Sequence, residues 1–328
     1  MEIAFSDVLF SVFSLVLLII PGYLLVKAKV IGQSAGEACS AIVLYGCQPA
    51  MLFMSFQKVA YDSRILWNML IVAGLTALVH GAMIGGVLLF TRKMPKSTKL
   101  NVIKYACVFS NCGYMGIPFL QSLFSGAYLG EVLIYAAVVI AVFNILSWTI
   151  GVYFVSGDKK ALSVKKMFLN PTIIAAVVGF LFFILLKKPF VELAPSGTAL
   201  DMLLEKAVQS LNFIGDTVTP LSMTVIGIRL ANVKLTRLFT EKSAYAVAGI
   251  KLIAMSVITI ACVAFLPVST VVKYVMFFLL SMPCATSTAL FAIRFNADED
   301  AGSIYVLFTT IASIVTIPLT YLLFGLFL

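Results

Sequence analysis

Long apolar runs alternate with short polar segments along the whole 328-residue chain. Each run has the length that an α-helix needs to cross the hydrocarbon core of a bilayer, roughly 20 residues. The longest polar interruption is only 157–167, too short for a soluble domain. The pattern predicts an all-α polytopic membrane protein with ten spans, at 6–27, 37–57, 65–91, 100–124, 128–155, 170–187, 200–230, 243–266, 272–294 and 302–327.

The fourth of these spans cannot form a continuous helix. Its segment SNCGYMGIP, residues 110–118, holds Gly113, Gly116 and Pro118 close together, and a proline removes a backbone donor and clashes with the preceding turn. In hydrocarbon, freed backbone groups are tolerated only where protein or a water-filled cavity satisfies them. A broken membrane helix with the amide of Asn111 at the break therefore predicts a binding site.

The ninth span repeats this feature in the second half of the chain. Its segment SMPCATST, residues 281–288, places Pro283 among small and hydroxyl residues. Spans 2 and 7 match in the same way, with Gln48 and Pro49 in one and Pro220 in the other. Interrupted helices at matching positions in two halves indicate an inverted-repeat transporter. The alternative is that Pro and Gly are simply common in membrane helices.

The lysines and arginines gather on one side of this topology. Of the 23 in the chain, sixteen lie in alternate connections that include 157–167, six lie in the other connections, and Lys251 lies inside a span. Because positive loops face the cytoplasm, we expect both termini on the outer side of the cell membrane. Five spans per half invert the second half and divide the chain into 1–156, a cytoplasmic loop at 157–169, and 170–328.

Composition agrees with this pattern and narrows the class of protein. The chain is 62% hydrophobic, has a mean hydropathy of +1.09 and only 11% charged residues, where soluble domains carry about 25%. The net charge of +9 does not indicate a nucleic-acid partner, because the cations lie between apolar runs, where they set topology. The first run follows an acidic start without a small-residue cleavage site, which favours a retained helix over a signal peptide.

The two breaks supply the groups that an anion site needs. Helix N-termini at a break present unpaired N–H groups and the positive end of a dipole, which hold a carboxylate without a buried arginine. Asn111 adds an amide donor, while the hydroxyls near Pro283 either join the site or bond back to the preceding helical turn. The substrate-binding residues predicted here are Asn111, Cys112, Gly113, Tyr114, Gly116, Pro118, Pro283, Ala285, Thr286, Ser287 and Thr288, with Gln48, Pro49 and Pro220 in a second rank.

Ionisable residues inside spans are rare and by default functional, and three of them stand out here. Asp216 and Lys251 either form an ion pair between neighbouring helices or take part in charge compensation, and a titrating Asp216 could carry a coupling proton. A static pair or snorkelling toward the interface is the structural alternative. His80, the only histidine, either joins them or simply bonds a backbone carbonyl.

The sequence holds no metalloprotease motif HExxH and no phosphate loop. A single histidine cannot build a multi-histidine metal site, and the six cysteines show no CxxC spacing. We therefore expect a protein that is not an enzyme and needs no cofactor or metal, and we interpret the cysteines as apolar fillers rather than disulfides.

Several motifs resemble those of the auxin efflux carrier family, which includes the plant PIN-type carriers and many bacterial members. Asn111 followed by Met115-Gly116-Ile117-Pro118 looks like the crossover motif of that family. In the second half, the resemblance is carried by Gly215, Asp216, Pro220-Leu221-Ser222-Met223, Lys251, Pro283 and the run from Arg294 to Asp298. It covers nearly the whole chain. Thr288 departs from the pattern, since PIN-type proteins have a second proline there.

The resemblance implies a fold and a function. It implies ten helices in two inverted five-helix repeats, with broken, crossing helices 4 and 9. Helices 1, 2, 6 and 7 would form a scaffold, and helices 3–5 and 8–10 a transport domain. It further implies a homodimer in the lipid bilayer that carries a small organic acid, auxin-like or a dicarboxylate, by alternating access.

Two other functions remain open from the sequence. The first is a sodium-coupled symporter of the bile-acid-carrier type, whose sodium sites use carbonyl, hydroxyl and carboxylate oxygens. The second is a non-transporting membrane sensor built on a carrier fold. Scarcity of acidic residues within the spans argues against the first.

Overall fold

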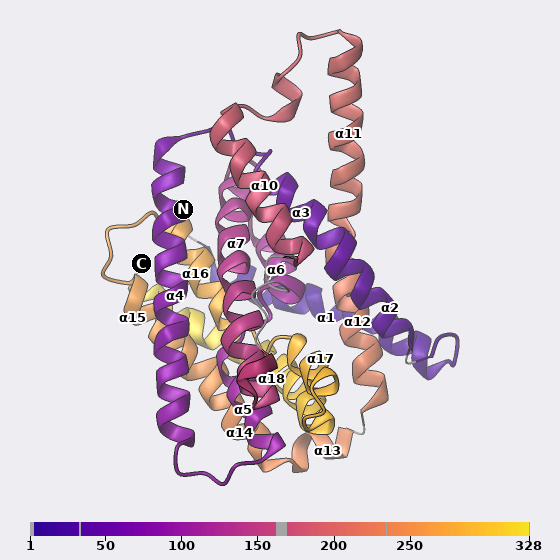
Figure 1. Ribbon diagram of the computed structural model, residues 1–328, viewed down its shortest axis with the longest axis vertical. Coiled ribbons are helices and arrows are strands. Elements are labelled where there is room, and N and C mark those ends of the chain that lie inside the picture. The colour runs from indigo at the N-terminus through magenta and orange to yellow at the C-terminus, as the bar shows by residue number, and fades with distance from the viewer. Residues whose placement is uncertain (1–2, 33, 162–168, 234, 328) are drawn as a thin grey trace.

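The protein folds as a bundle of membrane-length helices (Figure 1). The computed structural model describes residues 3–32, 34–161, 169–233 and 235–327. Within them all regular structure is helical, apart from one isolated antiparallel bridge between Ser110 and Cys284. The predicted all-α polytopic fold is confirmed.

Eight helical segments are long and apolar enough to cross a membrane, and they lie within a few residues of eight predicted spans. Some of these segments comprise two or three consecutive elements. They are α1 (Phe5–Lys27); α2 (Ser34–Ile42) with η1 (Val43–Cys47) and α3 (Gln48–Ser55); α4 (Ser63–Thr91); α7 (Ala127–Leu146) with η3 (Ser147–Gly151) and α8 (Val152–Ser156); α10 (Pro171–Leu186); α11 (Ala199–Asp216) with α12 (Val218–Asn232); α14 (Lys242–Ala248) with η6 (Gly249–Ala254) and α15 (Met255–Val263); and α18 (Glu299–Gly325). A short helix, α13 (Leu235–Thr240), precedes α14.

The remaining two predicted spans are the interrupted ones. The first comprises α5 (Thr98–Val108), η2 (Cys112–Gly116) and α6 (Ile117–Leu123), and the second comprises α16 (Thr270–Ser281) and α17 (Ser287–Arg294). In both, a non-helical segment separates two half-helices, so the predicted breaks are confirmed. The number of membrane crossings, ten if each interrupted helix counts as one, stays a prediction.

The start of α1 and the end of α18 lie at the same end of the bundle. The backbone N–H of Ile3 donates to Tyr274 Oη at 3.3 Å, and Tyr321 Oη donates to the carbonyl of Ile3. Tyr321 lies in the last turns of α18, and Figure 1 shows the two chain ends on the same side of the view. An even number of membrane crossings requires this arrangement.

The predicted interruptions in spans 2 and 7 take a milder form than expected. Pro49 lies in the first turn of α3, directly after the π-helical turn η1, and Pro220 lies in the first turn of α12. A proline in a first turn is tolerated, because the N–H it lacks has no partner in the helix there. The helices widen at Val43–Cys47 or turn at Thr217 without an extended gap.

Close helix contacts depend on glycine at two points. A Cβ on Gly22 of α1 would collide with the carbonyl of Thr224, and one on Gly227 of α12 with the carbonyl of Ile19. Small residues allow helix backbones to approach in this way within membranes. α1 and α12 therefore pack backbone to backbone.

Candidate functional site

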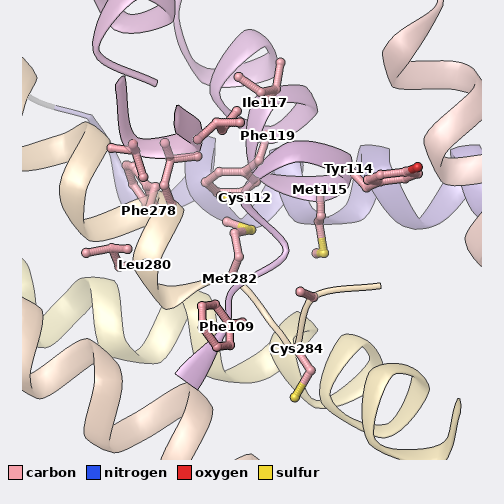
Figure 2. Packing of buried hydrophobic residues seen from close by; sticks show 14 of the residues in the cluster. Phe109, Cys112, Tyr114, Met115, Ile117, Phe119, Phe278, Leu280, Met282 and Cys284 are labelled. Atoms are coloured by element: carbon pink, nitrogen blue, oxygen red, sulfur yellow. The ribbon is translucent and has the colours of Figure 1, made fainter. Parts of the chain in front are cut away.

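The two interrupted helices cross at their extended segments and hydrogen-bond there. The N–H of Asn111 donates to the carbonyl of Pro283 at 2.8 Å, and the N–H of Ala285 donates to the carbonyl of Phe109 at 2.9 Å. Figure 2 shows Phe109 and Met282 beside this crossing, with Cys284 just beyond it. Each extended segment thus satisfies backbone groups of the other, which removes the cost of irregular backbone in the protein interior.

Side chains from neighbouring helices hold the crossing in place. Cys284 N–H donates to Thr309 Oγ1 of α18 at 3.1 Å, and Cys284 Sγ donates to the carbonyl of Ala106 at 3.2 Å. Ser110 Oγ donates to the carbonyl of Leu280 at 2.9 Å. The crossing is therefore fixed by the half-helices on both sides of it and by α18.

The first break occurs earlier than the sequence suggested. The non-helical backbone runs over 109–111, ahead of both glycines, and Pro118 lies in the first turn of α6, where a proline is tolerated. After the break the chain enters a π-helical turn, in which the N–H groups of Met115 and Gly116 both donate to the carbonyl of Asn111. Pro118 does not cause the break.

Two half-helices begin at the crossing, and no side chain caps either of them. One starts at Cys112 after Asn111, and the other starts at Ser287 after Thr286. The first N–H groups of a helix have no partner within it, and together they carry the positive end of the helix dipole. Both positive ends meet at the crossing, which favours an anion there.

A small cavity of about 70 Å³ lies against the crossing. We call it the crossover cavity. Asn111 is one of the residues that line it, and Asn111 Nδ2 is buried with no hydrogen-bond partner in the described part of the protein. Its lining residues are Leu44, Gln48, Ser110, Asn111, Gly113, Tyr114, Ile140, Phe143, Asn144, Ser147, Trp148, Ala285, Thr286, Ser287, Leu290 and Phe291.

The structure separates the residues predicted for the site into two sets. Those that line the crossover cavity are Asn111, Gly113, Tyr114, Ala285, Thr286, Ser287 and, from the second rank, Gln48. Those that do not line it are Cys112, Gly116, Pro118, Pro283, Thr288, Pro49 and Pro220. Gly116 instead faces Leu279 and Met282, where a Cβ would collide with the leucine side chain. It lets the half-helices approach each other and does not line the cavity.

None of the three hydroxyls near the second break shows a bond back to the preceding turn. Ser287 Oγ lies 2.7 Å from Tyr105 Oη, which also lies 2.6 Å from Ser147 Oγ. Thr288 Oγ1 is buried and has no partner among the described residues. Ser287 therefore joins a hydroxyl network on the cavity wall, whereas Thr288 lies outside the cavity.

Several lining residues are missing from the sequence prediction. Asn144, Ser147 and Trp148 come from the fifth span, where Asn144 Nδ2 donates to the carbonyl of Ile140 at 2.9 Å. Two polar residues three positions apart in an apolar run share one face of a helix, and this signal would have found Asn144 and Ser147. Ser110, beside Asn111, was also missed as a cavity residue.

All four π-helical turns in the described residues lie beside the crossing. Leu44 of η1, Gly113 of η2 and Ser147 of η3 line the cavity, and Lys251 of η6 bonds to Ser110. A π-helical turn shifts the direction of the following side chains and is frequent at functional sites. The four π-helical turns, each from a different span, therefore all lie at the crossing of the two interrupted helices.

Lys251 carries an uncompensated charge at the crossing. The side chain is fully buried, and its Nζ donates to Ser110 Oγ at 2.7 Å and to the carbonyl of Leu280 at 2.9 Å. None of the ion pairs among the described residues includes it. A buried ammonium without a carboxylate partner is costly unless an anion approaches it, so Lys251 adds to the positive potential of the two helix ends.

The predicted pairing of Asp216 with Lys251 is wrong. Asp216 is the exposed last residue of α11, whereas Lys251 is enclosed beside the crossing with other partners. Hydropathy alone could not tell on which face of its helix the aspartate lies. His80 is buried in α4, with Nδ1 2.8 Å from the carbonyl of Thr76, and its ring lies 5.9 Å from that of Phe109.

A second, larger cavity of about 490 Å³ lies on one side of the crossing, between α2, α12, α17 and α18. We call it the vestibule. Leu290 lines both cavities, and Arg229 of the vestibule donates to the carbonyl of Thr286 in the crossover cavity wall at 3.3 Å. The sequence placed Arg229 only among the loop cations.

No group of three or more His, Cys, Asp or Glu residues close enough to hold a metal ion is found among the described residues. The chemistry of the site is that of amide, hydroxyl and backbone donors with a lysine ammonium behind them.

Comparison with known proteins decides the family. The family model described as a membrane transport protein matches residues 7–164 and 159–321, nearly the whole chain. The chain belongs to this family, the auxin efflux carriers. A relative described as an uncharacterized transporter, from Methanothermobacter thermautotrophicus, is 22% identical over 312 residues, which cover 94% of this chain and 96% of the relative. The protein is thus a membrane transporter and not an enzyme.

Proposed function

We propose that the protein is a secondary carrier of a small organic anion, and that the carboxylate of the substrate binds in the crossover cavity. The observation that carries this proposal is the buried amide of Asn111, a residue that lines the cavity and whose Nδ2 has no partner in the described structure. Such a donor costs free energy while it is unpaired. A carboxylate oxygen would satisfy it.

The charges around the cavity support an anion rather than a cation. Two uncapped helix N-termini meet there, and Lys251 is bonded to Ser110 in the cavity wall. No aspartate or glutamate is among the residues that line the cavity. Hydrogen bonds to a charged acceptor are also stronger than neutral ones, by roughly twofold.

The size of the cavity supports alternating access. Sites that enclose a small organic molecule usually measure about 300–1,000 Å³, whereas the crossover cavity measures about 70 Å³. It has room for a carboxylate group and little more. The remainder of the substrate needs the cavity to widen, and the vestibule on the far side of Leu290 is where it would extend.

The packing of the helices supports a division into two parts, one of which would move relative to the other. In one group α1 and α2 pack against α12, and α3 packs against α10 and α11. In the other, α4 packs against α5, α7 and α15, α16 packs against α7 and α15, and α18 packs against α14 and α17. We assign the first group to the scaffold and the second, which contains the whole crossing, to the transport domain. Each part would take elements from both inverted halves, 1–156 and 170–328.

Coupling to sodium is less well supported than the uncoupled or proton-coupled alternatives. The Leu280 carbonyl and Ser110 hydroxyl are oxygen ligands of the kind that Na⁺ prefers, but the Lys251 ammonium already binds both. If protons are coupled, Lys251 and His80 are the candidates, since both lie beside the crossing, and Asp216 does not.

We further propose a homodimer in the cell membrane that pairs through α11, with the vestibule on the cytoplasmic side among the positive loops. Glu205, Gln209, Asn212 and Asp216 follow one face of α11 at spacings of four, three and four, and none of them is buried. α11 belongs to a segment long and apolar enough to cross a membrane. A polar stripe exposed to lipid is costly, and a second copy would cover it.

The proposed function is tested by ligand-induced stabilisation of the purified protein. Organic acids of increasing size, together with amines of matched shape, are screened for their effect on the melting temperature in detergent. A substrate that binds the folded state raises it by mass action. We expect one or more carboxylates, and no amine, to stabilise the wild type, and stabilisation by amines alone would contradict the proposal.

A further inference from the structure

Arg229 occupies the boundary between the two cavities. It lies in the last turn of α12 and lines the vestibule, while its Nη1 donates to the carbonyl of Thr286 in the crossover cavity wall at 3.3 Å. Leu290 forms the partition on the same boundary. A molecule that passes from the vestibule to Asn111 therefore passes this guanidinium.

The hydrogen-bonding capacity of Arg229 is largely unused. A guanidinium has five N–H donors, and the carbonyl of Thr286 is the one acceptor found for it among the described residues. The ion pairs there join Arg64 to Asp62 and Glu131, Lys99 to Glu241, and Arg237 to Asp300, and none includes Arg229. A partly buried cation with free donors and no salt bridge, whose acidic neighbour Glu37 is exposed, is a site for an external anion.

The acidic residues of the vestibule are exposed, unlike Arg229. Glu37, Glu299 and Asp300 line it and are all exposed, and Asp300 is already paired with Arg237 at 2.8 Å. Exposed charges are screened by salt, whereas partly buried ones are screened much less. Salt therefore screens the half-buried charge of Arg229 less than it screens these exposed carboxylates.

We propose that Arg229 is a second anion site, which binds the carboxylate of the substrate in the vestibule before the carboxylate reaches Asn111. This proposal rests on the proposed function. The planar guanidinium matches a carboxylate with two parallel N–H donors. Because only Nη1 is bonded to the carbonyl of Thr286, Nε and Nη2 are left to bind a carboxylate in this way.

Chemical protection of the arginine tests this assignment directly. The purified full-length protein is treated with phenylglyoxal, which modifies accessible arginines, with and without acetate, and the extent of modification at each arginine is read by mass spectrometry. We expect acetate, and not an equal concentration of chloride, to slow modification of Arg229 at least threefold, and to leave that of Arg64 unchanged. Equal modification of Arg229 with and without acetate would overturn the proposal.

The same measurement on Asn111→Ala separates this site from the crossover site. If Arg229 binds carboxylate independently, acetate protects it in the variant as in the wild type. Loss of protection in Asn111→Ala would overturn the assignment of a separate site, and it would leave the crossover site standing. Protection that persists while Asn111→Ala transports normally would instead contradict only the proposed function.

If phenylglyoxal does not reach Arg229, transport kinetics test whether this arginine binds the carboxylate of the substrate. In proteoliposomes, we expect Arg229→Gln to raise the KM for the transported acid about tenfold with a smaller change in maximal rate, and Arg229→Lys to recover part of the loss. An unchanged KM in Arg229→Gln would overturn the proposal.

Discussion

The backbone N–H of Asn111 donates to the carbonyl of Pro283 over 2.8 Å, and this bond joins two helices that the sequence places 172 positions apart. It lies where both helices are extended. Because the second half-helix of each begins at this point, the bond also brings two helix N-termini together. The anion site thus follows from a backbone contact rather than from a cluster of charged side chains.

Gly113→Ala should impair transport without preventing folding. A Cβ at this position would collide with the amide nitrogen of Gln48, the flexible end of a side chain in the crossover cavity wall. The cavity loses volume while the backbone keeps its place. We expect transport to fall about tenfold or more, the scale of one added methyl group in a packed pocket, measured as initial uptake into proteoliposomes.

Gly81→Ala in α4 is the matched control, because a Cβ there would meet nothing within 4 Å. It should keep transport and melting temperature near wild type or gain up to about 1 kcal/mol of stability from the better helix propensity of alanine. Equal loss of transport in both variants would contradict the steric account of Gly113.

Gly22→Ala should destabilise the bundle instead. Its Cβ would meet the backbone carbonyl of Thr224, which cannot rotate away as a side chain can. Overpacking of this kind costs about 1–3 kcal/mol. The check is the thermal melting curve in detergent, where a melting temperature equal to that of the wild type would show that α1 and α12 do not pack as described.

Lys251→Met should weaken anion binding while the fold survives. The carbonyl of Leu280 keeps a donor, because Ser110 Oγ also bonds to it, and the variant loses a buried charge that has no carboxylate partner among the described residues. An isolated buried charge costs free energy, and its replacement by an apolar residue of similar volume removes that cost.

We therefore expect the melting temperature of Lys251→Met to stay within a few degrees of wild type, and its affinity for the transported anion to fall at least about tenfold, which is 1.4 kcal/mol. Titration of the anion against the melting temperature gives both quantities. Wild-type affinity in this variant would remove Lys251 from the site.

Asp216→Asn should leave the pH dependence of uptake unchanged. The carboxylate is exposed at the end of α11 and does not line the crossover cavity. The measurement is initial uptake between about pH 5 and pH 8, the range in which a coupling group would titrate. A flattened pH profile in Asp216→Asn would restore the aspartate to a coupling role.

Glu241→Gln should reveal a pH-dependent contact between α5 and α14. The hydrogen bond from Lys99 and that from Ser243 lower the pKa of Glu241 from 4.5 to about 2. A lowered pKa stabilises the folded state above the ordinary value, and this contribution disappears as the pH falls from 4.5 toward 2. Because the pair is partly exposed, we expect a loss of about 0.5 kcal/mol in Glu241→Gln at pH 7.

Melting curves of Glu241→Gln and wild type at pH 7 and pH 3 give the comparison. The difference between the two proteins should narrow at the lower pH, where the wild-type carboxylate begins to take up its proton. A difference that widens at low pH has the wrong sign for a carboxylate with a lowered pKa.

The sequence predicted the spans because lipid imposes a length on every crossing helix, and it predicted both breaks because Gly113, Gly116 and Pro283 stand inside apolar runs. Asn111 was identified because its amide lies at the first of these breaks. The position of the first break was predicted less well. Pro118 drew attention, but a first-turn proline fits a helix, and the extended residues precede it.

The rest of the site depends on how distant helices meet. Ser147 and Lys251 lie in π-helical turns beside the crossing, and no sequence pattern predicted these turns. Arg229 looked like one of several cations after a span, and only the vestibule distinguishes it. The pairing of Asp216 with Lys251 is wrong because hydropathy gives the depth of a residue and not the face of the helix on which it lies.

The central claim, that Asn111 holds the carboxylate of the substrate, is tested most directly by uptake of the stabilising organic acid into proteoliposomes containing Asn111→Ala. We predict that uptake falls at least about tenfold, that Asn111→Asp abolishes it by like-charge repulsion, and that Asn101→Ala, in the same interrupted helix but outside the cavity, stays within twofold of wild type. Wild-type uptake by correctly folded Asn111→Ala would contradict the account.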